Sequence, residues 1–211
     1  MFEKLTKIAK PQLRQVLSHS FNTELFDGTL HSDNFRFFLA NDAIYLRGYA
    51  RLLNIIANRL DQPEHKSIFS KFSSETIETE LLIHRTFEVE KLSTPCGSIT
   101  EYLAHLDEHV NHSPISVGIA SVLPCFWLYR ELGKHAAIAQ TNETHPYKLW
   151  VETYASPEFY EATELAIKTF DEIADIKYEQ QTINTFLTSV EHEIAFWEES
   201  YSFYPRIYRF K

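Results

Sequence analysis

The sequence contains little glycine, only 5 residues in 211, and long stretches hold neither glycine nor proline. Tight turns between strands depend on residues that tolerate positive φ, so this scarcity argues against a turn-rich β fold. Hydrophobic residues make up 44% of the chain and aromatic residues 14%, which excludes a disordered protein. The length suffices for one substantial core. The sequence therefore predicts helices packed into a single domain over residues 1–211.

Positive charge is scarce as well, with 20 basic against 29 acidic residues and a formal charge of −9. An acidic surface repels phosphate groups, so we expect neither nucleic acid nor a membrane as a partner. No continuous apolar run of about 20 residues is apparent, and the N-terminal segment MFEKLTKIAK lacks the apolar core of a signal peptide. With only two cysteines, these features predict a cytoplasmic protein with reduced thiols.

Apolar residues at helical spacing predict an all-α fold. The strongest pattern covers residues 33–60, with Ser32 or Asp33 as the expected N-cap. Further patterns predict helices over 77–87, 99–113, 115–138 and 157–176, a short helix around Trp150, and a last helix from about Gln180 to Trp197. Pro124 falls inside residues 115–138, so this helix is expected to kink or to restart there.

Polar residues lie on helix faces that should be apolar. Asp42 and Tyr45 fall on the buried face of helix 33–60, and Glu193 lies one turn before Trp197. Burying an unpaired carboxylate costs several kcal/mol, on the order of the net stability of a domain. The two carboxylates therefore suggest a functional site in the interior. Pairing with tyrosine or arginine at the edge of each face is an alternative that these patterns leave open.

The segment HLDEHVNH places His105, His109 and His112 on one helix face, a spacing that could bind a metal ion. No carboxylate–histidine motif completes a ligand set nearby. We therefore interpret this face as a polar flank and predict no metal site.

The chain resembles the TenA family, known as thiaminase II or aminopyrimidine aminohydrolase. The resemblance covers roughly residues 19–201, in family order and at family-like spacing. It rests on the segments HSF, LFDGTL, FRFFLANDAIYL, TELLIHR, LPCFWLYRELG, YKLWVETYASPEF and HEIAFWEESY.

This resemblance implies a heme-oxygenase-like helical bundle with an interior pocket, assembled as a homo-oligomer, either a tetramer or a dimer. It also implies hydrolysis at the exocyclic methylene of an aminopyrimidine, without a cofactor. The substrate would be aminomethyl-aminopyrimidine or thiamin, and the product the hydroxymethylpyrimidine used in thiamin salvage. Ile44, Phe126 and the FWEES segment depart from common family residues, so the preferred pyrimidine stays open.

The resemblance also assigns roles to individual residues. Cys125 matches the family nucleophile, in the cysteine rather than the glutamate branch, and would add to an electron-poor ring carbon. Glu193 matches the acid/base carboxylate. Asp42 would accept hydrogen bonds from the 4-amino edge of the pyrimidine. The remaining matches line the ring and the thiol: Tyr45, Tyr102, Tyr129, Tyr154 and Phe196.

Two other functions compete with the hydrolase. Some relatives on this scaffold are metal-dependent oxidases, with histidine and carboxylate ligands on the helix that corresponds to 157–176. That helix holds carboxylates but no histidine, which argues against an oxidase; the carboxylates include Glu161, Glu164, Asp171 and Glu172. A non-catalytic pyrimidine-binding or regulatory protein is disfavoured by the presence of both Cys125 and Glu193.

Overall fold

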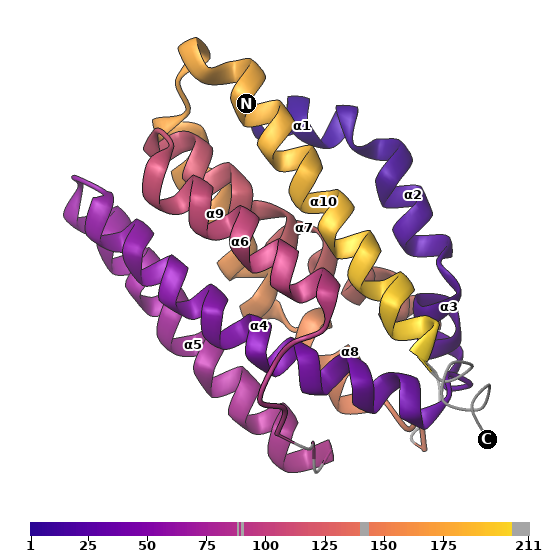
Figure 1. The fold of residues 1–211 in the computed structure, drawn as a ribbon. Coiled ribbons are helices and arrows are strands. Elements are labelled where there is room, and N and C mark those ends of the chain that lie inside the picture. Colours follow the sequence, from indigo (N-terminus) through magenta and orange to yellow (C-terminus); the bar gives the residue numbers. More distant parts are fainter. Residues whose placement is uncertain (88, 90, 140–143, 204–211) are drawn as a thin grey trace.

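The computed structural model describes residues 1–87, 89, 91–139 and 144–203. Every element within these ranges is a helix, which confirms the all-α prediction (Figure 1). The elements are α1 (Phe2–Ile8), α2 (Lys10–Ser18), α3 (Ser20–Asp27), α4 (Ser32–Arg59), α5 (Pro63–Phe87), α6 (Gly97–His112), α7 (Ile115–Ala139), α8 (Lys148–Ala155), α9 (Pro157–Ile173), the 3₁₀ helix η1 (Ile176–Tyr178) and α10 (Glu179–Tyr201).

The largest difference from the sequence prediction lies at the N-terminus, where α1, α2 and α3 were not predicted. Each has only 7 to 9 residues, too few turns for an apolar period to stand out. α5 begins at Pro63 and so extends 14 residues further toward the N-terminus than the 77–87 pattern. The predicted N-cap of α4 was wrong: His31 caps it, and its ring accepts a hydrogen bond from the Asp33 N–H.

The helix predicted over 157–176 begins at Pro157 as expected, with Ser156 as its N-cap. The Ser156 hydroxyl accepts a hydrogen bond from the Phe159 N–H at 3.2 Å, and proline occupies the first turn, where its missing N–H costs nothing. The helix ends at Ile173, three residues before the expected end, and η1 then turns the chain into α10.

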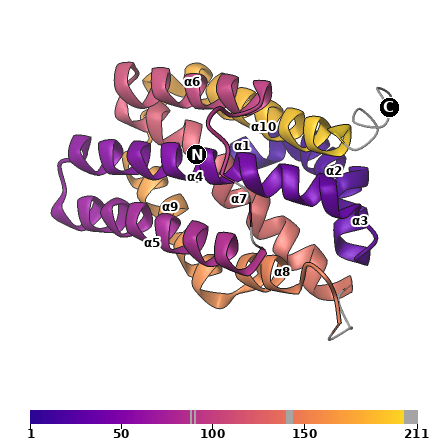
Figure 2. The same cartoon turned by 60° about the horizontal axis from the view of Figure 1, so that its bottom comes forward.

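Helix α7 lies in the middle of the bundle, with α4, α6, α8, α9 and α10 packed around it (Figures 1 and 2). It continues through Pro124, so the predicted restart does not occur. One stretch, Ile115–Ala136, is long and apolar enough to cross a membrane, although no such run was apparent in the sequence. Of the most apolar part of this stretch, 83% is buried inside the molecule, and the core helix of a globular protein has the same length and composition.

Helices α7 and α8 approach each other closely at Gly133. A Cβ atom at that position would lie 2.2 Å from the carbonyl oxygen of Tyr154 in α8. Only a residue without a side chain permits this contact. Gly133 therefore sets the distance between α7 and α8, and with it the position of the Tyr154 ring.

Candidate active site

The structure brings the sequence-predicted residues to one interior region from five helices. Asp42 and Tyr45 come from α4, Tyr102 from α6, Cys125 and Tyr129 from α7, Tyr154 from α8, and Glu193 and Phe196 from α10. Asp42 is 3% exposed and Glu193 is 1% exposed, so both carboxylates are in the interior and not at the edge of a helix face. The structure rules out the edge position, whereas the pairing with tyrosine that the alternative expected does occur at Glu193, which contacts Tyr102.

Glu193 is held by one defined hydrogen bond. The Tyr102 hydroxyl donates to Glu193 Oε1 at 3.2 Å. Burial raises the pKa of Glu193 to about 8, the Tyr102 hydrogen bond opposes this rise, and the negative charge of Asp42 adds to it. A carboxyl group with a pKa near neutrality can both give up and take back a proton.

The Cys125 thiol lies close to both carboxylates. Burial raises the pKa of Cys125 well above its ordinary value, and the charges of Glu193 and Asp42 raise it further. The hydroxyls of Tyr45 and Tyr49 act in the opposite direction, because hydrogen bonds to sulfur stabilise the thiolate. The resting group is therefore a thiol, with the Tyr45 hydroxyl beside it as a donor for a thiolate.

The Tyr45 hydroxyl is buried and has no partner of standard hydrogen-bond geometry. An unpaired buried hydroxyl costs free energy, and such groups persist mainly where they serve a function. Its position beside Cys125 makes it a donor that is available to the sulfur or to a bound molecule.

Aromatic rings form the walls around these polar groups. Tyr45 stacks on Tyr102 with ring centroids 5.0 Å apart, and Tyr129 packs against Tyr154 at 4.8 Å. Behind Tyr129 lie two buried indoles, those of Trp150 and Trp197. Flat walls with few convergent polar groups are typical of sites for aromatic ligands.

Phe196 is buried on the same side of the bundle and stacks on Phe38 of α4, with ring centroids 4.9 Å apart. Phe38 in turn packs edge-on against Trp150 at 6.4 Å. Phe196 thus belongs to the aromatic layer that continues from the walls around Tyr129 and Tyr154.

Tyr49 is a site residue that the sequence interpretation missed. It lies on the apolar face of its helix, one turn after Tyr45, where a tyrosine is ordinary packing. Its hydroxyl donates to the Val122 carbonyl at 2.8 Å, in the helical turn that precedes Cys125. The four-residue spacing from Tyr45 was the signal that could have identified it, since residues four apart on a helix share a face.

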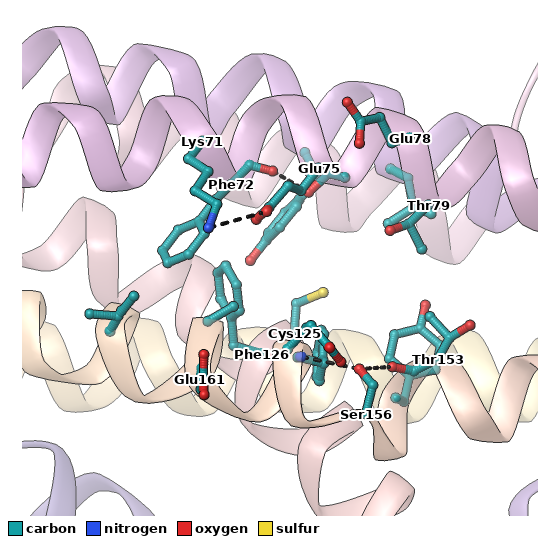
Figure 3. A pocket seen from close by; sticks show the side chains of 18 of the residues that line it. Lys71, Phe72, Glu75, Glu78, Thr79, Cys125, Phe126, Thr153, Ser156 and Glu161 are labelled. Carbon is teal, nitrogen blue, oxygen red and sulfur yellow. Dashed lines mark hydrogen bonds and ion pairs between the residues drawn. The ribbon is translucent and has the colours of Figure 1, made fainter.

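A cavity of about 460 Å³ opens between α5 and the α8–α9 segment, with the Cys125 sulfur pointing into it (Figure 3). We call it the outer cleft. Of the eight predicted residues, only Cys125 and Tyr154 line it. Its other lining residues are Leu46, Tyr49, Lys71, Phe72, Glu75, Thr76, Glu78, Thr79, Leu82, Phe126, Thr153, Ser156, Glu158, Phe159, Glu161, Ala162 and Leu165.

Negative charge dominates the outer cleft. Two glutamates come from α5, Glu75 and Glu78, and two from α9, Glu158 and Glu161. The one lysine among the lining residues, Lys71, pairs with Glu75 at 3.4 Å. Because opposite charges attract, this lining favours a cationic group over an anionic one.

The other candidate carboxylates of α9 have structural partners. Glu164 pairs with Arg130, Asp171 binds the amino group of Met1 at 2.9 Å, and Glu172 binds His65 at 2.8 Å. Within the described ranges, no group of three or more histidine, cysteine, aspartate or glutamate side chains is placed to hold a metal ion. His105 contacts both His109 and His192 of α10, whereas His112 is exposed.

Comparison with known proteins gives a consistent result along nearly the whole chain. The model of the TENA/THI-4/PQQC family matches residues 6–202. An aminopyrimidine aminohydrolase from Halalkalibacterium halodurans is 30% identical, and the match covers 92% of each chain. The thiamine biosynthesis multifunctional protein ThiED from Corynebacterium glutamicum is also 30% identical over 87% of this chain, which spans 24% of that longer protein.

Solved structures share the fold. A TenA homologue from P. horikoshii OT3 superposes with a TM-score of 0.86 at 22% identity, covering 95% of this chain and 97% of its own. A domain with a heme oxygenase-like fold from Shewanella denitrificans OS217 superposes with a TM-score of 0.78 at 12% identity, covering 97% and 94%. The predicted heme-oxygenase-like helical bundle is confirmed.

Proposed function

Because the chain belongs to the TENA/THI-4/PQQC family, we propose that it is an aminopyrimidine aminohydrolase of thiamin salvage. It converts aminomethyl-aminopyrimidine, and by the same chemistry thiamin, to hydroxymethylpyrimidine. The observation that carries the proposal is the placement of Cys125 at the floor of the outer cleft, with buried Glu193 behind it. As part of the same proposal, the protein acts in the cytoplasm as a single-domain homo-oligomer, a tetramer or a dimer.

The pyrimidine ring lies between the aromatic walls, with its 4-amino edge on Asp42. The Cys125 sulfur adds to an electron-poor ring carbon while the thiol proton passes to the ring, and the Tyr45 hydroxyl stabilises the developing thiolate. Addition breaks the aromaticity of the ring, so the exocyclic leaving group can depart.

Glu193 supplies both proton transfers of the remaining steps. The ammonium form of the substrate loses one proton to solvent as it binds. Glu193 in its protonated form, which its raised pKa favours, then gives its proton to the neutral amine, which departs as ammonia, whereas the thiazolium of thiamin departs as neutral thiazole and needs no proton. The resulting carboxylate then takes a proton from water as the water oxygen bonds to the exocyclic methylene. Loss of the Cys125 sulfur restores the aromatic ring and the free thiol.

The charge of the outer cleft supports a cationic leaving group. An aminomethyl group is protonated near neutral pH, and the thiazolium of thiamin carries a permanent positive charge. Either group would extend from the pyrimidine into the space between α5 and α9, among the four glutamates.

The test is incubation of the purified full-length protein with aminomethyl-aminopyrimidine and, separately, with thiamin, followed by chromatography of the products. We expect hydroxymethylpyrimidine from the first substrate, equal turnover after treatment with EDTA, and no turnover by Cys125→Ser. Turnover that chelation abolishes and iron restores would replace the hydrolase with an oxidase. Tight pyrimidine binding without any product would identify a binding protein.

A further inference from the structure

The ring of Tyr102 stacks against two other rings, each from a different helix. One is Tyr45 of α4, and the other is His192 of α10, whose ring lies 5.3 Å from that of Tyr102 and only 14° from parallel. His192 directly precedes Glu193 in the sequence, and its ring contacts two rings of α6, those of Tyr102 and His105.

Two more histidines support His192 from behind. His105 packs against it with ring centroids 5.1 Å apart, and His109 meets His105 edge-on at 4.7 Å. Serine hydroxyls fix the two α6 rings: His105 Nε2 lies 2.9 Å from Ser189 Oγ, and His109 Nδ1 lies 2.9 Å from Ser113 Oγ. We call these three residues the histidine layer.

We propose that His192 is a positioning residue for the acid/base group. The flat imidazole holds the Tyr102 ring in the orientation from which its hydroxyl donates to Glu193 Oε1. A single hydrogen bond at 3.2 Å depends on the tilt of the phenol ring, because hydrogen bonds weaken steeply with angle. This inference rests on the proposed function, since it assigns His192 a part in the proton transfers of Glu193.

The histidine layer holds the Tyr102 ring without placing a positive charge near Glu193. Burial lowers the pKa of His192 and His109 and brings that of His105 to about 4, and the neighbouring imidazoles contribute to the lowering at His105. The nearby carboxylates Glu101 and Glu191 oppose this at His192, and Glu108 opposes it at His109. Neutral imidazoles leave the high pKa of Glu193 intact, so the layer acts by shape and packing.

The test compares two apolar replacements that differ in planarity. His192→Leu keeps the bulk but loses the flat ring, and His192→Phe keeps the flat ring but loses the ring nitrogens. His112→Leu is the matched control, because His112 lies on α6 outside the histidine layer and is exposed. If His192→Leu fails to fold, His192→Gln takes its place as a polar variant without a ring.

Two measurements apply to each variant. The first is the infrared absorption of the protonated Glu193 carboxyl as a function of pH in the substrate-free protein, assigned by its absence in Glu193→Gln. The second is kcat and KM for aminomethyl-aminopyrimidine across pH. The infrared titration does not require turnover, so a failure of the proposed function is distinguishable from a failure of this inference.

We expect His192→Leu to raise the apparent pKa of Glu193 by about 0.5 to 1 unit, because a weakened Tyr102 hydrogen bond stabilises the carboxylate less. Its kcat should fall roughly 3- to 10-fold with KM nearly unchanged. His192→Phe and His112→Leu should match the wild type in both measurements. Equal titrations in the Leu and Phe variants, whether shifted or not, would overturn the proposal.

Discussion

The two sides of Cys125 differ in almost every physical respect. On the inner side lie buried carboxylates and phenols, Asp42, Glu193 and Tyr102 among them, and the Tyr102 hydroxyl donates to Glu193. On the outer side, exposed glutamates such as Glu158 and Glu161 line a cleft that is open to solvent. A carboxyl group needs burial to have a pKa near neutrality, and it needs exposure to attract a ligand from solution. The molecule meets both requirements by placing buried carboxylates on one side of the Cys125 sulfur and exposed carboxylates on the other.

The largest expected effect comes from variants that remove the reactive groups of the inner side. Cys125→Ser replaces the thiol with a much less acidic hydroxyl, and Glu193→Gln removes the transferable proton while keeping the shape. We expect Glu193→Gln to lower kcat by about 10²–10⁴-fold and Cys125→Ser by at least as much, with pyrimidine affinity retained in both. Steady-state kinetics and calorimetric titration with hydroxymethylpyrimidine would measure the two quantities. Near-normal turnover in Cys125→Ser would show that the thiol only fills space.

A second test concerns what burial of Glu193 costs in stability. Its folded pKa of about 8 lies above the value of 4.5 for an exposed glutamate, so the folded protein holds a proton that the unfolded chain releases. The free energy of unfolding should therefore fall as the pH rises from about 4.5 to about 8, by up to several kcal/mol at about 1.4 kcal/mol per unit.

Glu193→Gln should lack this part of the pH dependence and should be more stable than the wild type above pH 8. Urea unfolding of both proteins between pH 5 and pH 9 would measure the difference. Parallel pH profiles for the two proteins would mean that Glu193 is not the group with the raised pKa.

A third test changes the position of Tyr154. This residue belongs to both sides of Cys125, because it lines the outer cleft and also contacts Tyr129 on the inner side. Gly133→Ala would place a methyl group against the Tyr154 backbone, so α8 must shift. We expect a loss of about 1–3 kcal/mol of stability, together with lower turnover.

Gly48→Ala is the matched control, because the atoms nearest to its Cβ belong to the Leu103 side chain, which can rotate away, and not to backbone. It should leave turnover unchanged, and the gain in helix propensity should offset part of any strain. Thermal unfolding and kinetics of the two variants provide the comparison. Equal effects at both glycines would argue against a special role for the α7–α8 contact.

The smallest expected effect is a change in KM caused by variants in the outer cleft. Glu158→Gln and Glu161→Gln each remove one exposed charge from the cleft, and interactions of exposed charges are worth about 0–1 kcal/mol. We expect KM for the cationic aminomethyl substrate to rise about 2- to 5-fold at low salt, with kcat unchanged. Binding of the neutral hydroxymethyl product should not change, and high salt should erase the difference in KM.

The sequence predicts a feature well when the residues that reveal it all lie within one helix. Asp42 and Glu193 could be selected because a carboxylate on an apolar face breaks a periodic pattern, and the long helices were evident from the same period. The histidine spacing on α6 was visible too, but its partner His192 was not, because that contact joins two helices far apart in the chain.

The outer cleft could not be predicted for a related reason. Its walls come from α5 and α9, and nothing in either segment indicates that the other faces it. Tyr49 was overlooked because a tyrosine on a buried face is ordinary packing until its hydroxyl is seen to reach the turn before Cys125.

The raised pKa of a thiol at the floor of an open cleft has a consequence for the durability of the protein. Peroxides and alkylating agents react with thiolates far faster than with thiols. Cys125 is within their reach, yet between turnovers it remains in its less reactive protonated form. Ageing by oxidation should therefore be slow in the resting protein and should accelerate only when a bound molecule draws the proton from the sulfur.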